Sequence, residues 1–277
     1  MKISLIQTSQ NRKSELARFV KSLNEQVGID FSQVQLIFVD QEDNRSVFDI
    51  LDKRIEFTYI KYKHCSLSSA RNIGLKYVNG EYVGFPDDDC WYEQDTLNKV
   101  FKCYNTNIDG VVAKGMDEYG RLTNSFPREK KMLTRYDRCG AISYTIFVRF
   151  DRSILFDEML GVGSQYGLGA GEETDYILRL MEEKGLTFEY NPNVIVHHPF
   201  FAPTINKKTL DKIKSYSRGN GYLLKKHRFP ITYVLEQFIR PILGSVFYLL
   251  KGNVLRSRHS MNVFKGRIQG YFYKRKF

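Results

Sequence analysis

Short apolar runs alternate with stretches of helical periodicity through the first hundred residues, and this alternation constrains the fold more than any other feature. The runs expected to be strands are residues 3–7, 34–39, 57–60 and 82–85. The stretches expected to be helices are residues 14–23, 67–77 and 97–104. Strands separated by helices usually pair in parallel, and continuous apolar runs are typical of a sheet covered on both faces. The pattern predicts an α/β domain built on a parallel sheet with crossover helices.

The pattern loosens after residue 105. Residues 115–140 are polar, with glycine, proline and adjacent lysines, and we expect a loop or a partly ordered flap there. Apolar residues resume at 142–150, and a segment rich in glycine spans 161–171. A helix is predicted for 174–185, because its apolar residues have helical spacing and Gly185 is a typical helix end. Residues 194–196 predict a last short strand.

Positive charge is concentrated at the C-terminal end of the chain. Residues 201–277 carry 17 Lys and Arg but two acids, although the net charge of the whole chain is +11. The bases are interleaved with aromatic residues, and 241–250 is an apolar run. Such a segment suits an amphipathic helix on an anionic membrane, but nucleic-acid binders and helical subdomains with a solvated basic face share its composition. We favour the membrane surface and expect no nucleic-acid partner; a helical subdomain is compatible with that hypothesis.

The expected compartment is the cytoplasm, with the protein peripheral at the inner face of the cell membrane. No apolar run reaches the roughly 20 residues that a membrane span needs, and the first run is too short for a signal peptide. Cys65, Cys90, Cys103 and Cys139 form no Cys-x-x-Cys pair and lack zinc-finger spacing to histidine. We expect them to be reduced thiols.

Three consecutive carboxylates, Asp87, Asp88 and Asp89, follow the apolar run 82–85. In open α/β sheets, ligands bind beyond the carboxyl ends of the strands. Asp87 and Asp89 point the same way in an extended chain, so together they can offer oxygens to Mg²⁺ or Mn²⁺. A solvated acidic turn is the alternative interpretation of the same residues.

A second acidic group, Glu172, Glu173 and Asp175, opens the predicted helix that follows the glycine-rich segment. Acids in a first helical turn are favoured by the helix dipole alone. Glycines that allow a ligand to approach closely make a general base there an alternative. His197 and His198 follow the last predicted strand, and one of them is a candidate third metal ligand.

Taken in order, these motifs resemble glycosyltransferase family 2. Residues 3–12 followed by a helix resemble the nucleotide-binding start of that family, and Phe38-Val39-Asp40 resembles its second-strand aspartate. Residues 69–74 and 80–89 are similar to the stretch that leads into its Asp-x-Asp motif. Residues 156–175, with Arg179 on the helix, resemble its acceptor-side motif.

The resemblance implies a GT-A fold, a nucleoside diphosphate sugar as donor, a Mg²⁺ or Mn²⁺ cofactor and an inverting transfer. It implies residue roles that we carry over by position. The implied donor-binding residues are Thr8, Asp40, Arg71, Asp87 and Asp88. The implied metal ligands are Asp89, Asp87 and His197. The implied general base is Glu173, where the family more often has aspartate, with Glu172 as the neighbouring alternative.

The predicted organisation is a Rossmann-like GT-A catalytic domain over residues 1–200 and a basic, mainly helical tail over 201–277. Residues 1–105 are expected to bind the nucleotide sugar, and 106–200 the acceptor. The predicted reaction is sugar transfer to a hydroxyl of a glycan or a lipid-linked acceptor in cell-surface polysaccharide synthesis. A nucleotidyltransferase, which also uses paired aspartates, and a non-catalytic nucleic-acid-binding protein are the alternatives.

Overall fold

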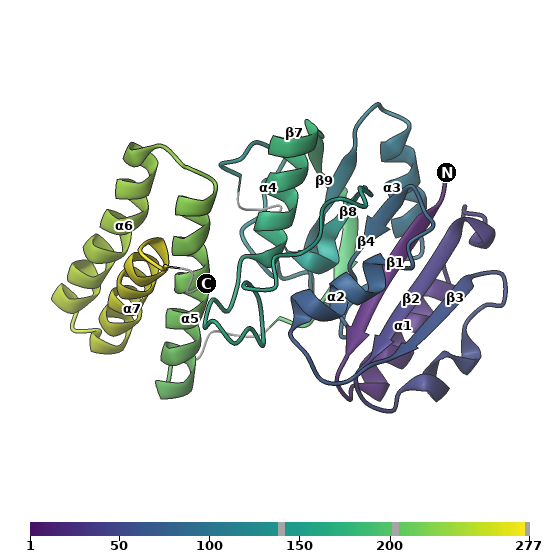
Figure 1. The fold of residues 1–277 in the computed structure, drawn as a ribbon, viewed down its shortest axis with the longest axis horizontal. Helices are drawn as coiled ribbons and strands as arrows, with labels where there is room; N and C mark the ends of the chain where they lie inside the picture. The colour runs from purple at the N-terminus through teal and green to yellow at the C-terminus, as the bar shows by residue number, and fades with distance from the viewer. Residues whose placement is uncertain (138–141, 201–204, 275–277) are drawn as a thin grey trace. The chain divides into compact units, whose positions relative to one another are not determined.

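The strands form one mixed sheet in the computed structural model, which describes residues 1–137, 142–200 and 205–274 (Figure 1). Their order is β3-β2-β1-β4-β8-β6-β9-β5, and β7 pairs with β9. Strands β1 to β4 pair in parallel, as do β6 and β9, whereas β8 is antiparallel to both of its neighbours. The bounds are β1 (Ile3–Ser9), β2 (Val34–Asp40), β3 (Glu56–Lys61), β4 (Tyr82–Gly84), β5 (Trp91–Tyr92), β6 (Gly110–Met116), β7 (Lys131–Met132), β8 (Ile146–Arg149) and β9 (Phe188–His197).

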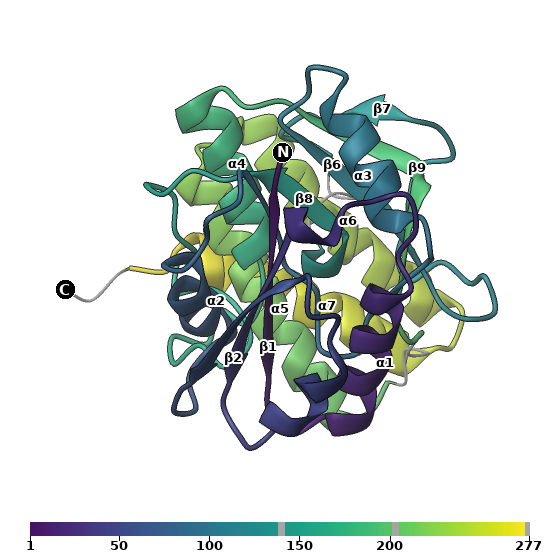
Figure 2. The ribbon, with the colours of Figure 1, turned by 90° about the vertical axis from the view of Figure 1, so that its right-hand side faces the viewer.

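Helices cover both faces of this sheet, as the continuous apolar strands require. Figure 2 shows α1 and α3 on one side of the strands and α2 and α4 on the other. On β1, Ile3 and Leu5 pack in the same core cluster as α1, while Ile6 packs with Leu75 of α2. The helix bounds are α1 (Lys13–Asn24), α2 (Leu67–Leu75), α3 (Thr96–Tyr104) and α4 (Glu172–Lys184), and short 3₁₀ turns are η1 (Phe31–Gln33), η2 (Arg45–Ile50) and η4 (Ser143–Thr145).

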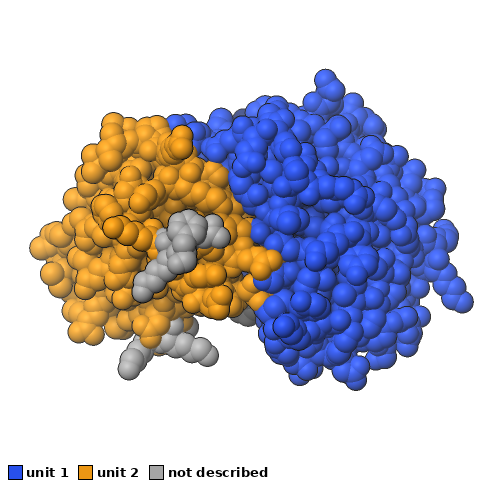
Figure 3. Space-filling view, viewed as in Figure 1, with its two compact units in different colours: residues 1–65, 69–156, 176–201 blue, residues 66–68, 157–175, 202–277 orange. Residues whose placement is uncertain are grey.

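The described chain divides into two compact units, coloured separately in Figure 3. Unit 1 contains the sheet and comprises residues 1–65, 69–156 and 176–201. Unit 2 comprises residues 66–68, 157–175 and 202–277. Its helices are α5 (Lys207–Lys226), α6 (Ile231–Leu250) and α7 (Val254–Tyr271). The C-terminal region is therefore helical, as predicted, and the unit also includes the glycine-rich segment that the sequence analysis assigned to the acceptor part.

Most of the elements expected before residue 105 are confirmed, and the differences lie mainly after it. Strand β6 was not expected, β7 lies inside the predicted loop, and β9 is longer than residues 194–196. Cys65, Cys90 and Cys103 form no disulfide, and none of the described helices has the length and apolar content to cross a bilayer. Cys139, the end of the predicted loop, and residues 201–204 and 275–277 of the predicted tail lie outside the described residues.

Candidate active site

Polar side chains from three strands meet at one edge of the sheet in unit 1. Because β1, β2 and β4 are parallel neighbours, their carboxyl ends share this edge. Ser9 ends β1 opposite Asp40 at the end of β2. Asp87, Asp88 and Asp89 follow β4 after two residues. The predicted acidic cluster therefore lies where ligands bind in open α/β sheets.

Asp87 and Asp88 have separate hydrogen-bond partners. Asp87 Oδ1 accepts hydrogen bonds from Arg71 Nη2 at 3.2 Å and from Ser143 Oγ at 2.8 Å. Asp88 Oδ2 accepts one from Ser9 Oγ at 2.8 Å. The neighbouring carboxylates are thus held by groups from different elements.

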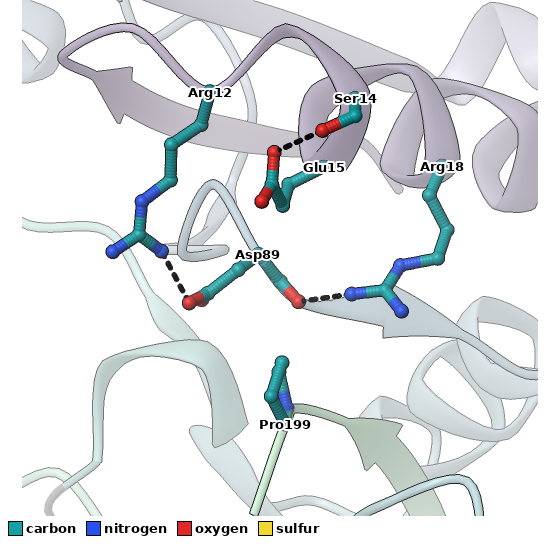
Figure 4. Close-up of a pocket in the computed structure, with 6 residues that line it drawn as sticks. All are labelled: Arg12, Ser14, Glu15, Arg18, Asp89 and Pro199. Atoms are coloured by element: carbon teal, nitrogen blue, oxygen red, sulfur yellow. Dashed lines mark hydrogen bonds and ion pairs between the residues drawn. The ribbon is translucent and has the colours of Figure 1, made fainter. Parts of the chain in front are cut away.

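Asp89 is 6% exposed and is contacted from two sides. Its Oδ1 lies 3.0 Å from His198 Nε2, and its Oδ2 forms an ion pair with Arg12. The carbonyl oxygen of Asp89 accepts a hydrogen bond from Arg18 Nη2 at 3.0 Å. Figure 4 shows both arginines reaching Asp89 from the α1 side. Three cationic or polar groups therefore converge on one buried residue.

The pKa values of Asp88, Asp89 and His198 are shifted by burial and by their close contacts. Burial raises the pKa of Asp88 to about 6, and the charges of Asp89 and Asp87 add to the rise. Burial also opposes ionisation of Asp89, but the hydrogen bond and charge of His198, with the charge of Arg12, outweigh it and lower the pKa. Burial acts to lower the pKa of His198, yet the hydrogen bond to Asp89 outweighs it and raises the pKa. Added positive charge would stabilise such a cluster.

The histidine beside the aspartates is His198, not the predicted His197. The ring of His198 stacks on Tyr144 with centroids 4.5 Å apart. His197 instead stacks on Trp91 at 5.2 Å, and its Nε2 lies 3.3 Å from Glu93 Oε1. Successive side chains of an extended chain point to opposite faces of the sheet. Two adjacent histidines therefore lie in different surroundings, one beside the aspartates and the other beside Trp91.

Asp87, Asp89 and His198 fit the predicted divalent cation. One ligand atom from each lies within 4.8 Å of the others, and all three belong to unit 1. Carboxylate oxygens suit Mg²⁺ and Mn²⁺, and an imidazole nitrogen is a further ligand for the transition metal. Phosphate oxygens of a substrate commonly complete such a shell.

A cavity of about 560 Å³ adjoins Asp89 and is lined by Arg12, Ser14, Glu15, Arg18 and Pro199 (Figure 4). The Arg18 guanidinium lies 3.6 Å from the centroid of the Trp91 ring, which holds it at this wall. Two guanidinium groups beside a candidate cation site form a surface that suits phosphate. Arg18 was not expected as a site residue, and Arg12 was quoted only as the end of a motif, whereas His198 was considered beside His197 as the third metal ligand.

Asp40, one of the predicted donor-binding residues, makes structural contacts within unit 1. Buried Asp40 accepts hydrogen bonds from the backbone N–H groups of Glu42 and Asn44 and from the Tyr59 hydroxyl. Burial opposes ionisation of Asp40, but these bonds outweigh it and lower the pKa. Burial and the bond to Asp40 raise the pKa of Tyr59 to about 12, so this hydroxyl stays a donor.

Arg71 is 2% exposed, and its guanidinium lies 5.4 Å from the centroid of the Phe156 ring. It therefore orients Asp87 from below the surface of the site. Thr8 lies one residue before the end of β1, paired with Val39.

The predicted general bases belong to unit 2, at the start of α4. Glu172 is buried, whereas Glu173 is partly exposed. Gly161 has a φ of +102°, and a β-carbon there would lie 2.8 Å from Glu172 Cδ. The glycine therefore makes room for that carboxyl group.

Asp175, also in the first turn of α4, is fully buried. His227 Nε2 and Lys226 Nζ lie 2.9 Å and 2.7 Å from its Oδ1. These contacts anchor the first turn of α4 to α5 within unit 2.

Comparison with solved structures identifies the fold. The S. aureus TarS fragment 1-349 matches 99% of this chain and 93% of its own length, with a TM-score of 0.62 and 16% identity. The mannosyltransferase PcManGT from Pyrobaculum calidifontis, solved with GDP-Man and Mn²⁺, matches 98% of this chain and 87% of its own length, with a TM-score of 0.60 and 11% identity. The mixed sheet with its flanking helices is therefore the GT-A fold of glycosyltransferases, as predicted.

The sequence comparisons then give the family. Residues 4–160 match the family described as Glycosyl transferase family 2. This chain belongs to glycosyltransferase family 2. The minor teichoic acid biosynthesis protein GgaB of Bacillus subtilis (strain 168) is 26% identical over 78% of this chain and 27% of its own length. Glycosyltransferase GlyA of Streptococcus pneumoniae serotype 4 is 44% identical over 55 residues, which are 20% of this chain and 8% of its own length. The matched residues of the chain thus span less than a third of either relative.

Proposed function

We propose that this protein is an inverting, metal-dependent glycosyltransferase that moves a sugar from a nucleoside diphosphate sugar to a hydroxyl of a cell-surface glycan or its lipid-linked precursor. The observation that carries the proposal is the group Asp87, Asp89 and His198 beside a cavity lined by Arg12 and Arg18. A diphosphate ester needs compensation of its charge, and this edge of the sheet offers both a cation site and two guanidinium groups.

The donor is proposed to bind with its diphosphate toward Arg12 and Arg18. Guanidinium groups hold phosphate oxygens by paired hydrogen bonds. TarS has been solved with UDP and with UDP-GlcNAc, and the Pyrobaculum enzyme with GDP-Man. We therefore propose a UDP-linked sugar as the first donor to test and a GDP-linked sugar as the second.

The cation, Mg²⁺ or Mn²⁺, would be held by Asp87, Asp89 and His198, and it would neutralise charge on the leaving diphosphate. Arg71 and Ser143 keep the Asp87 carboxylate oriented. Contacts with basic groups favour the ionised form of buried Asp89, and the ionised carboxylate is the form that binds a cation.

Glu173 is proposed to accept the proton of the acceptor hydroxyl. An inverting transfer needs one such base and no nucleophilic carboxylate, because the hydroxyl attacks the anomeric carbon directly. Partial exposure leaves Glu173 accessible to an acceptor, whereas Glu172 is buried beside Gly161. We infer that Glu172 shapes the glycine-rich segment and that Glu173 carries the chemistry.

The acceptor class is proposed from the name of the relative GgaB, a minor teichoic acid biosynthesis protein. We propose a cytoplasmic protein at the inner face of the membrane, with a teichoic-acid-type acceptor tested first.

The function is tested by incubating the protein with UDP-linked and GDP-linked sugars, Mn²⁺ and acceptor, and by identifying the released nucleotide. Release of a nucleoside diphosphate that stops when a chelator is added supports the proposal. Release of pyrophosphate would instead indicate nucleotidyl transfer. Unchanged turnover in excess chelator would contradict the proposed metal dependence. Glu173→Gln is expected to lower turnover by roughly 10²–10⁴ with donor affinity retained. Glu172→Gln is the matched variant, and a dead Glu172→Gln beside an active Glu173→Gln would reassign the base.

A further inference from the structure

Helix α6 in unit 2 turns its large apolar side chains outward. Leu243 is 63% exposed and Leu250 is 83% exposed. Four further exposed residues continue the same face at helical spacing. This apolar stripe consists of Leu235, Ile239, Leu243, Val246, Phe247 and Leu250.

The inward face of α6 buries Val234 together with three small or polar residues. Gln237, Pro241 and Ser245 are buried, and Ser245 Oγ lies 2.9 Å from Ser257 Oγ on α7. Figure 1 and Figure 2 show α6 beside α7. The usual order of a water-exposed helix, with large apolar residues inside and polar residues outside, is largely reversed here, since the most exposed side chains are large and apolar.

The neighbouring contact between α5 and α7 uses glycines. A β-carbon at Gly270 would lie 1.9 Å from the Arg218 carbonyl oxygen, and one at Gly221 would lie 2.0 Å from the Arg267 carbonyl oxygen. Small residues at helix contacts, with large apolar residues facing outward, are characteristic of helices that face lipid. The glycine contacts between α5 and α7 and the apolar stripe on α6 thus both indicate that this helical unit faces lipid.

The charge around the stripe has one sign. From Ile231 to Lys274 the chain carries seven Lys and Arg and one acid, Glu236, which pairs with Arg240 on the same helix. Lys251 and Arg256 are exposed just beyond the C-terminal end of the stripe. Bases beside an exposed apolar face complement an anionic leaflet, in which apolar residues enter the acyl boundary and bases meet the headgroups.

We propose that α6 docks on an anionic lipid bilayer through its apolar stripe, with the flanking bases at the headgroups. A lipid surface fits better than a second copy of the chain, because pairing two such faces would bring like charges together. The proposal is independent of the donor chemistry in unit 1.

The test is co-flotation of the full chain with vesicles of phosphatidylcholine alone and with vesicles containing about a quarter phosphatidylglycerol. Binding is expected on the anionic vesicles and is expected to weaken as salt rises. A double variant, Leu243→Gln with Leu250→Gln, is expected to lose at least about tenfold in partitioning. The matched control is Ile50→Gln, which changes a similarly exposed apolar residue of unit 1 and should leave partitioning unchanged.

A charge variant separates the two parts of the proposal. Lys251→Gln with Arg256→Gln should remove most of the preference for anionic vesicles, by roughly fivefold for each base. Equal binding of the double leucine variant and wild type would overturn the proposal. So would a lipid-free wild-type dimer that this variant converts to a monomer, since the stripe would then be a self-association face. Circular dichroism of each variant checks that its helical content matches that of wild type.

Discussion

Replacing each of the two adjacent histidines by phenylalanine tests the candidate cation site most directly. His198→Phe keeps a flat ring that can stack on Tyr144 but removes the nitrogen that lies 3.0 Å from Asp89. His197→Phe likewise keeps a ring over Trp91. The pair therefore separates loss of a ligand atom from loss of packing.

The expected magnitudes differ between the two sites. Changes to groups that merely support metal ligands cost about 10–100-fold in affinity, so losing one of three candidate ligands should cost at least that much, about 1.4–2.8 kcal/mol or more. His198→Phe should also lower stability, by about 1.5–3 kcal/mol, because the buried Asp89 carboxylate loses a hydrogen-bond partner. The His197 contact is with partly exposed Glu93, and such ion pairs contribute at most about 1 kcal/mol.

Isothermal titration of Mn²⁺ in the presence of a donor nucleotide measures the affinity, and urea unfolding measures the stability. We expect His198→Phe to lose metal affinity and His197→Phe to retain it. Equal Mn²⁺ affinity in the two variants would refute the assignment of His198. A loss confined to His197→Phe would restore the ligand that the sequence resemblance implied.

Three further outcomes follow from contacts described above. Gly270→Ala should destabilise unit 2 by about 1–3 kcal/mol, because the added carbon meets the backbone of α5. The control is Gly244→Ala, whose nearest neighbour is 3.3 Å away and which should be neutral or stabilising. Thermal melts compare the stability of the two variants. Asp175→Ala should cost about 1–3 kcal/mol in urea unfolding, since buried His227 loses its contact with the carboxylate while Lys226 keeps Asp157, and an unchanged midpoint would contradict this role. Tyr59→Phe should cost about 1 kcal/mol at neutral pH by removing a donor to Asp40. Because the pKa of Asp40 is lowered by folding, that difference should be present above about pH 4 and shrink as pH falls through the folded pKa; a pH-independent difference would argue against it.

The first four strands could be predicted because each is a short, continuous apolar run. Strand β6 was missed because Gly110 and Gly115 interrupt its apolar residues, and both glycines are needed there: a β-carbon at Gly110 would lie 2.7 Å from the Phe188 ring. Strand β9 was shortened because Asn191 and Pro192 lie within it, at a register irregularity opposite β6. Propensity disfavours these residues, and pairing with neighbouring strands overrides it.

Some residues of the candidate site could be found from a local motif, whereas others depend on contacts between segments far apart in the chain. Asp87 and Asp89 could be found from the sequence because the cluster is continuous and follows a strand. Choosing between His197 and His198 required the orientation of β9, since a strand reverses the facing of its side chains at every residue. Arg18 lies 71 residues from Asp89 in the chain, and its contact depends on how α1 packs.

Backbone contact between α5 and α7 leaves no room for compensating substitutions. Where two leucines meet, one side chain can shrink while its neighbour grows, so many combinations keep the volume constant. At Gly221, Gly266 and Gly270 the opposing surface is main chain, which cannot shrink. Variation in this unit should therefore be tolerated on the outer face of α6, where many apolar residues are interchangeable, while these three positions should each remain glycine.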